Sequence, residues 1–376
     1  MNTLRLACAS ALVFLACSGG AYALDADAAA KAFLTPAKSA GSETSVTMGA
    51  VSEEGSDVVV KDVMTSAKVD GEETAQGVVA EVRFKNVAET GDGQFTASGA
   101  EYSDITFSVQ DKMEIKIPKI IIDDLRTRNA DSDKIPMPVV YKSVVGDNLT
   151  LLVKEQNVMV NVDQVRFAMD DFANDVPSSG NMSITGIDIP LAAFPPGPNS
   201  PQALGYTENL VFDINAKGRA RYDTAGFSLD DMTISADTIG SLSLGLDMDN
   251  YPNLMNTENP NPMEMMNVVL NSIRLKYVDD SLAVRILDMM AKQQGIERAQ
   301  FAQQISMALP FMLSAINNQE FQNEVATAAG AFLTDPGTIE VNVMPEKPMS
   351  AAEIMGVAQS APHTLPDQLN VTIEAR

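Results

Sequence analysis

Hydrophobic and polar residues alternate along most of the chain, a pattern typical of β-strands with one buried face. Four ten-residue segments align with one another and contain most of this alternation: VVVKDVMTSA (58–67), AEYSDITFSV (100–109), VNVDQVRFAM (160–169) and FSLDDMTISA (227–236). A looser fifth segment, VVLNSIRLKYV, covers 268–278. The pattern predicts a repeated long strand.

Three of these segments share an aspartate at the fifth position: Asp62, Asp104 and Asp231. A hydrophobic residue follows at the sixth position, and the alternation then resumes. We interpret the aspartates as a polar bulge or turn near the middle of a long strand, where exposed Asp is common. A ligand-binding role for them is the less favoured interpretation.

Turn sequences separate the predicted strands and indicate hairpins. They are EEGSD (53–57), VDGEE (69–73), TGDGQ (90–94) and VGDN (145–148). The strongest break is FPPGPNSPQ (194–202), because proline cannot donate a ladder hydrogen bond. We place a linker there, between an N-terminal β-rich unit (24–193) and a C-terminal β unit with helices (203–376).

The period changes to that of helices after Asp280, which we expect to cap the first of them. That helix would present Leu282, Ile286 and Met289 or Met290, and Gly295 would end it. A second would present Phe301, Ile305, Leu309 and Met312, with a kink at Pro310. A third begins near Asn318 and a short one at the capping box SAAE (350–353), with strands at 338–344 and 368–375. The fold class is therefore α+β, with mainly antiparallel curved sheets in two repeated units and C-terminal helices packed on a sheet.

Methionine is concentrated near these helices, with nine of the 21 between Met248 and Met312. Methionine fills irregular core gaps, and it also lines promiscuous apolar surfaces. Ordinary core packing is one interpretation; a groove for an apolar ligand is the other. The candidate ligand-binding residues in the second case are Leu282, Ile286, Met290, Phe301 and Ile305. A membrane-surface helix fits less well, because such helices favour Lys and Arg whereas Asp288 and Glu297 occur here.

The first 23 residues predict a secretory signal peptide, with one charge at Arg5, an apolar run and the small-residue motif AYA before the cleavage point. An alternative makes Cys17 a lipoprotein cysteine, although Phe14 and Leu15 match that motif poorly. Cleavage after Ala23 would remove both cysteines, leaving neither a disulfide nor a thiol. We therefore expect a periplasmic protein without a transmembrane span.

The charge and the rare residue types limit the chemistry. Residues 24–376 contain 25 basic and 50 acidic residues, a net charge of −25, which would repel nucleic acid. The chain has one histidine, His363, and no tryptophan, so we expect no metal, no cofactor and no histidine-based catalysis. DMDN (247–250) and NADSD (129–133) resemble calcium loops only faintly.

Several stretches together resemble a group of uncharacterised exported proteins of alphaproteobacteria: AAAKAFLTPAKSAGSETSVTMGAVSEEGSDVVVKDVMTSA, LKYVDDSLAVRILDMMAKQQG, AFLTDPGTIEVNVMPEKP and LPDQLNVTIEA. The strand repeat, such as FSLDDMTISA, also resembles AsmA-like envelope proteins, whose long curved sheets form hydrophobic grooves. The chain departs from those proteins in its shorter length and in having no N-terminal membrane anchor. Neither resemblance brings a catalytic motif.

These features favour a non-enzymatic periplasmic envelope protein that binds a lipid or other apolar ligand, or an envelope protein partner. The doublets of carboxylates, such as Asp170–Asp171 and Asp230–Asp231, keep open a hydrolase with a carboxylate pair. A structural or adhesive module is the third alternative.

Overall fold

The computed structural model describes residues 24–34, 42–69, 72–91, 93–110, 112–128, 139–173, 176–198, 200–252 and 261–376. The predicted signal peptide, with Cys8 and Cys17, lies outside these residues and stays a prediction. The segment NADSD also lies outside them. No described helix is both long and apolar enough to cross a membrane.

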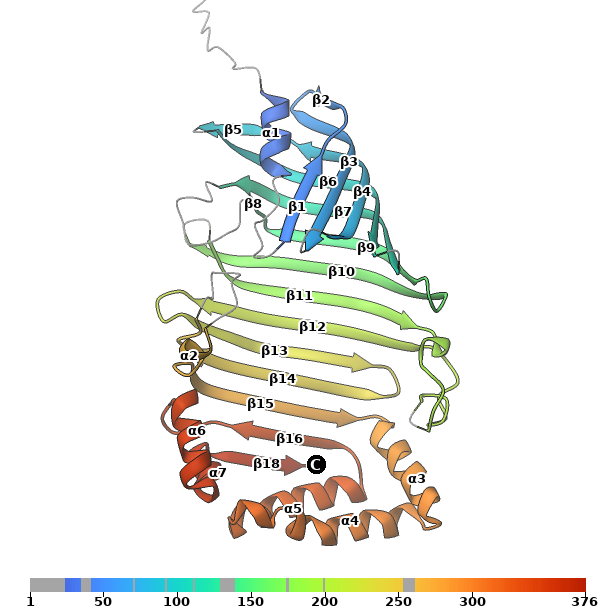
Figure 1. The fold of residues 1–376 in the computed structure, drawn as a ribbon, viewed down its shortest axis with the longest axis vertical. Helices are drawn as coiled ribbons and strands as arrows, with labels where there is room; N and C mark the ends of the chain where they lie inside the picture. Colours follow the sequence, from blue (N-terminus) through green and yellow to red (C-terminus); the bar gives the residue numbers. More distant parts are fainter. Residues whose placement is uncertain are drawn as a thin grey trace, which may run out of the picture.

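The described strands form a single 18-stranded sheet (Figure 1). Its first strands are β1 (Ser42–Thr47), β2 (Val51–Glu54), β3 (Asp57–Val69), β4 (Glu72–Lys85), β5 (Ala88–Gly91), β6 (Gln94–Val109) and β7 (Met113–Thr127). The central strands are β8 (Val139–Val140), β9 (Ser143–Val153), β10 (Val158–Ala173), β11 (Val176–Ile189), β12 (Leu210–Arg221), β13 (Gly226–Ala236) and β14 (Gly240–Asp249). The last are β15 (Val269–Asp279), β16 (Thr338–Val343), β17 (Met349–Ser350) and β18 (Val371–Ala375).

The long strands form one antiparallel meander. Its order is β3, β4, β6 and β7, then every strand from β9 to β16, and finally β18. Short strands pair at the margins: β1 and β2 with β3, β5 with β6, β8 with β7, and β17 with β15. The expected α+β class with curved antiparallel sheet is thus confirmed. The segment 194–202 joins β11 to β12, which pair directly, so the two predicted units share one sheet. Their separation as domains stays a prediction.

Helices lie at the two ends of the sheet and along one side of it (Figure 1). They are α1 (Ala26–Phe33), α2 (Pro262–Met265), α3 (Leu282–Gln294), α4 (Arg298–Met312), α5 (Gln319–Thr334), α6 (Ala351–Ser360) and α7 (Leu365–Gln368). The described residues also form three short 3-10 helices: η1 (Leu191–Ala193), η2 (Ser314–Ile316) and η3 (Pro362–Thr364). The expected end of α3 at Gly295, in the left-handed region, and the capping box of Ser350 and Glu353 are confirmed.

The predicted cap of α3 is wrong by one residue. Ser281 occupies the N-cap position instead of Asp280 and makes no side-chain capping bond. Asp279 performs the capping from the end of β15, since its Oδ1 accepts a 2.7 Å hydrogen bond from the amide of Ala283. The strand thus supplies the acceptor that the first turn of the helix requires.

A crease crosses the sheet where backbones enter the left-handed region. Four strands each contribute one residue with φ between 51° and 65°: Asp62 of β3, Asp104 of β6, Asn148 of β9 and Gly186 of β11. The pairing registers put Ala80, Pro118 and Asp163 of the intervening strands at the same level, so these residues form one row. Asp, Asn and Gly are the residue types that tolerate this conformation best.

The crease explains the repeated sequence pattern. Val58 and Val60 are buried before Asp62, and Val63 is buried directly after it. At Asp62 and Asp104 the predicted interruption is a left-handed residue inside a continuous strand rather than a bulge or turn, because the pairing keeps its register on both sides of each aspartate. In β13 the interruption is a true bulge, because its registers with β12 and β14 both shift at Asp230 and Asp231.

One turn prediction is wrong for the same reason. VGDN (145–148) lies inside β9 rather than between two strands. Its asparagine, Asn148, belongs to the crease, where a left-handed residue continues the strand instead of reversing it.

Candidate apolar groove

Cross-strand pairing aligns apolar side chains in two rows on one face of the sheet, because directly paired residues point to the same side. The first row is Val58, Phe84, Ala100, Ile122, Val144, Phe167, Met182, Ala216, Met232, Leu244, Leu275, Val341 and Ile373. The second is Val60, Val82, Tyr102, Ile120, Gly146, Val165, Ile184, Ile214, Ile234, Leu242, Tyr277, Ile339 and Ala375. Neither row contains a charged residue in any of its strands.

The helix α1 covers the first end of these rows. Phe33 is 5% exposed and stacks on Phe84 with 4.7 Å between ring centroids. Ala29 and Ala30 of the same helix are fully buried against this core. The apolar side chains of β3, β4 and β6 therefore form an ordinary filled core. Burial there raises the pKa of Tyr102 to about 12.

The helix α5 covers the other end. Phe332 packs edge-on against Tyr277 of the second row, with 6.0 Å between ring centroids. Glu324 accepts a 2.9 Å hydrogen bond from the amide of Ile373, which lies on the last strand of the sheet. That bond satisfies an amide at the sheet edge, a position that would otherwise be open to pairing with another chain.

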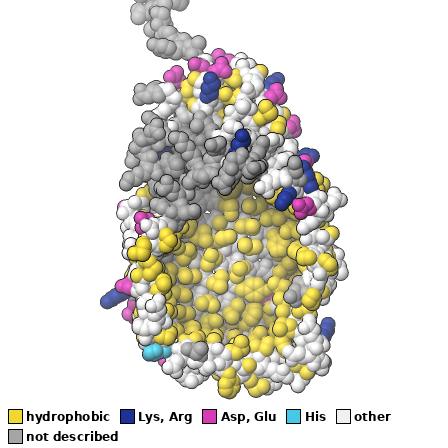
Figure 2. Space-filling view, in the orientation of Figure 1, with side chains coloured by type: hydrophobic (Ala, Val, Ile, Leu, Met, Phe, Trp, Pro, Cys, Tyr) yellow, Lys and Arg dark blue, Asp and Glu magenta, His cyan; other side chains and the backbone are white. Residues whose placement is uncertain are grey.

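Between the two covers, the same rows are open among the residues that the structure describes. Phe167, Leu242 and Leu275 are 39%, 43% and 41% exposed, on β10, β14 and β15. Figure 2 shows this concave face as a hollow lined by hydrophobic side chains. Five strand intervals of about 4.8 Å give the open span from β10 to β15 a length of roughly 24 Å. We call this region, with β10–β15 as its floor, the apolar groove.

The opposite face of the same strands is polar. Its cross-strand row is Arg166, Ser183, Asn215, Thr233, Ser243, Lys276, Glu340 and Glu374. The hydroxyls of Thr233 and Ser243 are hydrogen-bonded at 2.7 Å, and the Ser183 hydroxyl donates to Asn215 at 2.9 Å. On these strands the two continuous apolar rows therefore belong to one face, that of the groove.

A polar cluster ties β12 to β14 and β15. Arg221 donates to Asp247 at 2.6 Å and to Asp249 at 3.0 Å. Asn271 donates to Asp249 at 2.8 Å. The hydrogen bond from Asn271 has the largest effect on the pKa of Asp249 and lowers it. Partial burial opposes this shift, and Arg221 lowers the pKa further. Arg221 therefore binds both aspartates of DMDN, the sequence that faintly resembles a calcium loop.

The five residues predicted to bind a ligand differ in how deeply they are buried. Phe301 is 3% exposed and packs with Leu287 and Ala291 between α3 and α4, and Ile305 packs against this small core. Leu282 and Ile286 are half-buried on α3, and Met290 is exposed. The assignment of a ligand to them stays a prediction. The open sheet residues were missed, although their alternation with polar neighbours was visible in the sequence.

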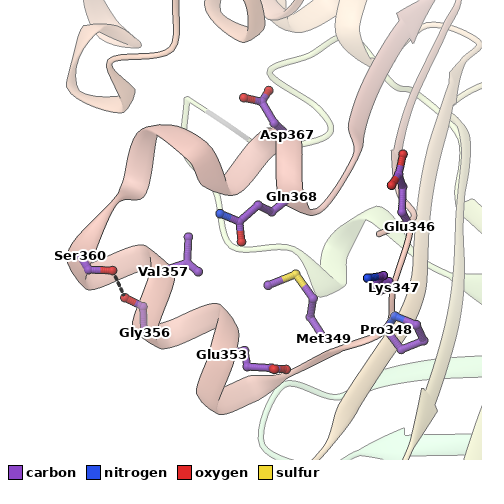
Figure 3. A pocket seen from close by; sticks show the side chains of 10 residues that line it. All are labelled: Glu346, Lys347, Pro348, Met349, Glu353, Gly356, Val357, Ser360, Asp367 and Gln368. Carbon is purple, nitrogen blue, oxygen red and sulfur yellow. Dashed lines mark hydrogen bonds between the residues drawn. The ribbon is translucent and has the colours of Figure 1, made fainter.

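A second cavity lies beside α6 and α7, with a volume of about 840 Å³ (Figure 3). Glu346, Lys347, Glu353 and Asp367 supply its charges. The carboxylate of Glu353 belongs to the capping box of α6, because it accepts hydrogen bonds from the amide and the hydroxyl of Ser350 at 2.7 and 2.8 Å. No cluster of three metal-ligating side chains occurs among the described residues.

The described carboxyl groups whose pKa is clearly shifted take part in ion pairs, hydrogen bonds and a helix cap. The carboxyl groups with a resolved shift all have a lowered pKa: Glu101, Glu114, Asp230, Asp249 and Glu353. A general acid of a hydrolase would need a raised pKa. No described carboxyl group has a resolved shift in that direction.

Comparison with known proteins adds one match. Residues 233–376 match the model of a family described as "Uncharacterized protein". This part of the chain begins in β13 and contains the C-terminal helices. The comparison with curated proteins gave no match.

Proposed function

We propose that the protein binds an elongated apolar ligand, such as the acyl chain of a lipid, along the apolar groove, without catalysing a reaction. The observation that carries this proposal is the pair of apolar rows, which helices cover at both ends and which are open from β10 to β15 among the described residues. Burying open apolar surface is favourable by about 25 cal/mol per Å². A chain molecule lying across the strands would gain that burial along the whole row.

The groove favours a long hydrocarbon over a small polar substrate. Its floor offers side chains such as Phe167, Ile214 and Leu244, and its span is roughly 24 Å. Typical small-molecule sites place convergent polar groups among the apolar ones. Here the floor residues of both rows are uncharged, which favours recognition by shape and burial.

We place this activity in the periplasm, as a proposal supported by the pattern of residues 1–23. An envelope protein segment is the second candidate occupant, because an apolar face of a sheet can also receive an amphipathic helix. The acidic chain argues against nucleic acid as a partner.

The first test is native mass spectrometry of protein purified gently from the periplasm, followed by solvent extraction. We expect a mass excess that disappears on extraction and yields a lipid. A protein at its bare chain mass that also fails to bind added long-chain fatty acid would contradict the proposal.

Matched variants locate the ligand. Phe167→Gln combined with Leu242→Gln puts two polar groups in the groove floor, and we expect at least a tenfold loss of fatty-acid affinity. Arg166→Gln combined with Lys217→Gln puts the same residue type on the opposite face and should leave affinity unchanged. Equal binding by both variants would place the ligand outside the groove.

A further inference from the structure

The C-terminal half of α4 exposes large apolar side chains to solvent. Met307, Phe311 and Met312 are 60%, 82% and 72% exposed. Met307 and Phe311 are four residues apart and lie on one side of the helix, and Met312 is the last residue of α4. Phe301 lies one turn before Ile305, near the start of α4, and is buried in the helical core. The exposed patch therefore belongs to the C-terminal end of α4. We call these three residues the α4 tip.

The α4 tip lies in an uncharged stretch of an acidic chain. Residues 299–319 contain no Asp, Glu, Lys, Arg or His, although the whole chain has a net charge of −24. The exposed polar residues of this stretch, such as Gln303, Gln304 and Asn317, are neutral. Such a surface can enter a low-dielectric environment without desolvating an ion.

The tip also lies at the covered end of the groove. α4 packs on α5, which covers the second apolar row at Tyr277. In Figure 1, α4 forms the lower end of the molecule, and Figure 2 shows hydrophobic side chains gathered at that end. An apolar surface touching α4 would therefore adjoin the helices that close the groove.

We propose that the α4 tip inserts into the surface of a lipid bilayer whose headgroups are zwitterionic and carry no net charge. Phenylalanine enters the boundary between headgroups and acyl chains, as it does in interfacial helices, and the flexible apolar side chains of the two methionines accompany it. The absence of Lys and Arg from residues 299–319 removes attraction to anionic lipid, and the charge of −24 opposes it.

A second copy of the chain fits the tip less well. A stable interface needs about 800 Å² from each partner. An aromatic side chain supplies roughly 150–250 Å² even when wholly buried. Three side chains therefore fall short, whereas insertion into a bilayer needs no complementary surface.

Flotation with phosphatidylcholine vesicles tests the proposal on extracted, ligand-free protein. We expect the protein to float with these vesicles at low and high salt alike, and to float less with vesicles containing phosphatidylglycerol. Phe311→Ser combined with Met312→Ser should weaken vesicle partitioning at least tenfold. Met344→Ser combined with Met355→Ser, at other exposed methionines, should leave it unchanged.

The results separate this proposal from ligand binding in the groove. No flotation of the wild type, or equal flotation of both double variants, would overturn the membrane contact while leaving fatty-acid binding untouched. Loss of a dimer on Phe311→Ser/Met312→Ser substitution, seen by light scattering, would assign the tip to a second copy instead. The thermal melting of each variant checks that it is folded.

Discussion

At the scale of single residues, the crease makes a sharp prediction about Asp104. Its φ of 51° lies where a β-branched side chain is strongly disfavoured. We expect Asp104→Val to lower the free energy of unfolding by about 1–3 kcal/mol. Urea denaturation monitored by circular dichroism measures this change.

Two controls isolate the backbone effect. Asp104→Gly keeps access to positive φ, so it should cost less than about 1 kcal/mol. Ser103→Val, at the preceding position of β6, should be nearly neutral, because valine is favoured in strands. Equal losses for the Asp104→Val and Asp104→Gly variants would mean that the aspartate side chain, rather than its φ, matters.

The hydrogen-bonded cluster around Asp249 predicts a pH dependence. Its pKa is lowered in the folded protein, chiefly by Asn271, so its ionised form stabilises the fold. This contribution is complete above the unfolded pKa of about 3.9 and is lost as pH falls through the lower folded value. The Asp249→Asn variant should therefore be less stable than the wild type at pH 7. This difference in the free energy of unfolding should disappear below pH 4.

Urea midpoints measured from pH 7 to pH 2.5 test this. Glu155→Gln, in the exposed turn between β9 and β10, is the control and should follow the wild-type curve. A gap of constant size at all pH values would show that the Asp249→Asn substitution disturbs packing rather than charge.

At the scale of elements, α1 is predicted to stabilise the first part of the sheet. Phe33 is buried against Phe84 and Phe95, and its removal would leave a cavity in that core. Phe33→Ala should lower the free energy of unfolding by about 3–5 kcal/mol. Phe311→Ala, at the exposed α4 tip, should change it by less than about 0.5 kcal/mol. Similar midpoints for both variants would mean that α1 is not part of the cooperative core.

The sequence predicts elements well where a local signal sets them. Gly295 ends α3 and Ser350 with Glu353 opens α6, because caps act over three or four residues. The sequence pattern predicts the wrong element at Asn148. The residue type favours a turn there, whereas pairing with the neighbouring strands continues β9 through this position. The local pattern at VGDN cannot distinguish these outcomes, since both need a left-handed residue.

The groove was harder to predict because it depends on pairing between distant strands. Phe167, Met182 and Ala216 align only through the registers of β10, β11 and β12. A residue such as Phe301 has the same apolar character in sequence but is covered by neighbouring helices. Whether an apolar row is filled or open is therefore a property of the assembled sheet.

At the scale of the whole molecule, the continuous sheet joins a filled core to an open groove. The largest fully buried side chains all lie in β3, β4 and β7, whereas the groove floor is half-exposed. Local stability follows apolar burial. We therefore expect hydrogen exchange to be slowest in β3, β4 and β6 and faster in β12–β14 when the groove holds no ligand.

Ligand should change this gradient in one direction. A molecule that binds only the folded state stabilises it by RT ln(1 + [L]/Kd), about 2.7 kcal/mol at a hundredfold excess over Kd. Adding a long-chain fatty acid should slow exchange in β10–β14, because those strands form the floor, and leave local opening in β3–β6 nearly as before. Phe167→Gln/Leu242→Gln should remove the slowing, and Arg166→Gln/Lys217→Gln should keep it. Slowing confined to α6 and α7 would move the ligand to the cavity beside Glu346, since a ligand protects the amides nearest to it.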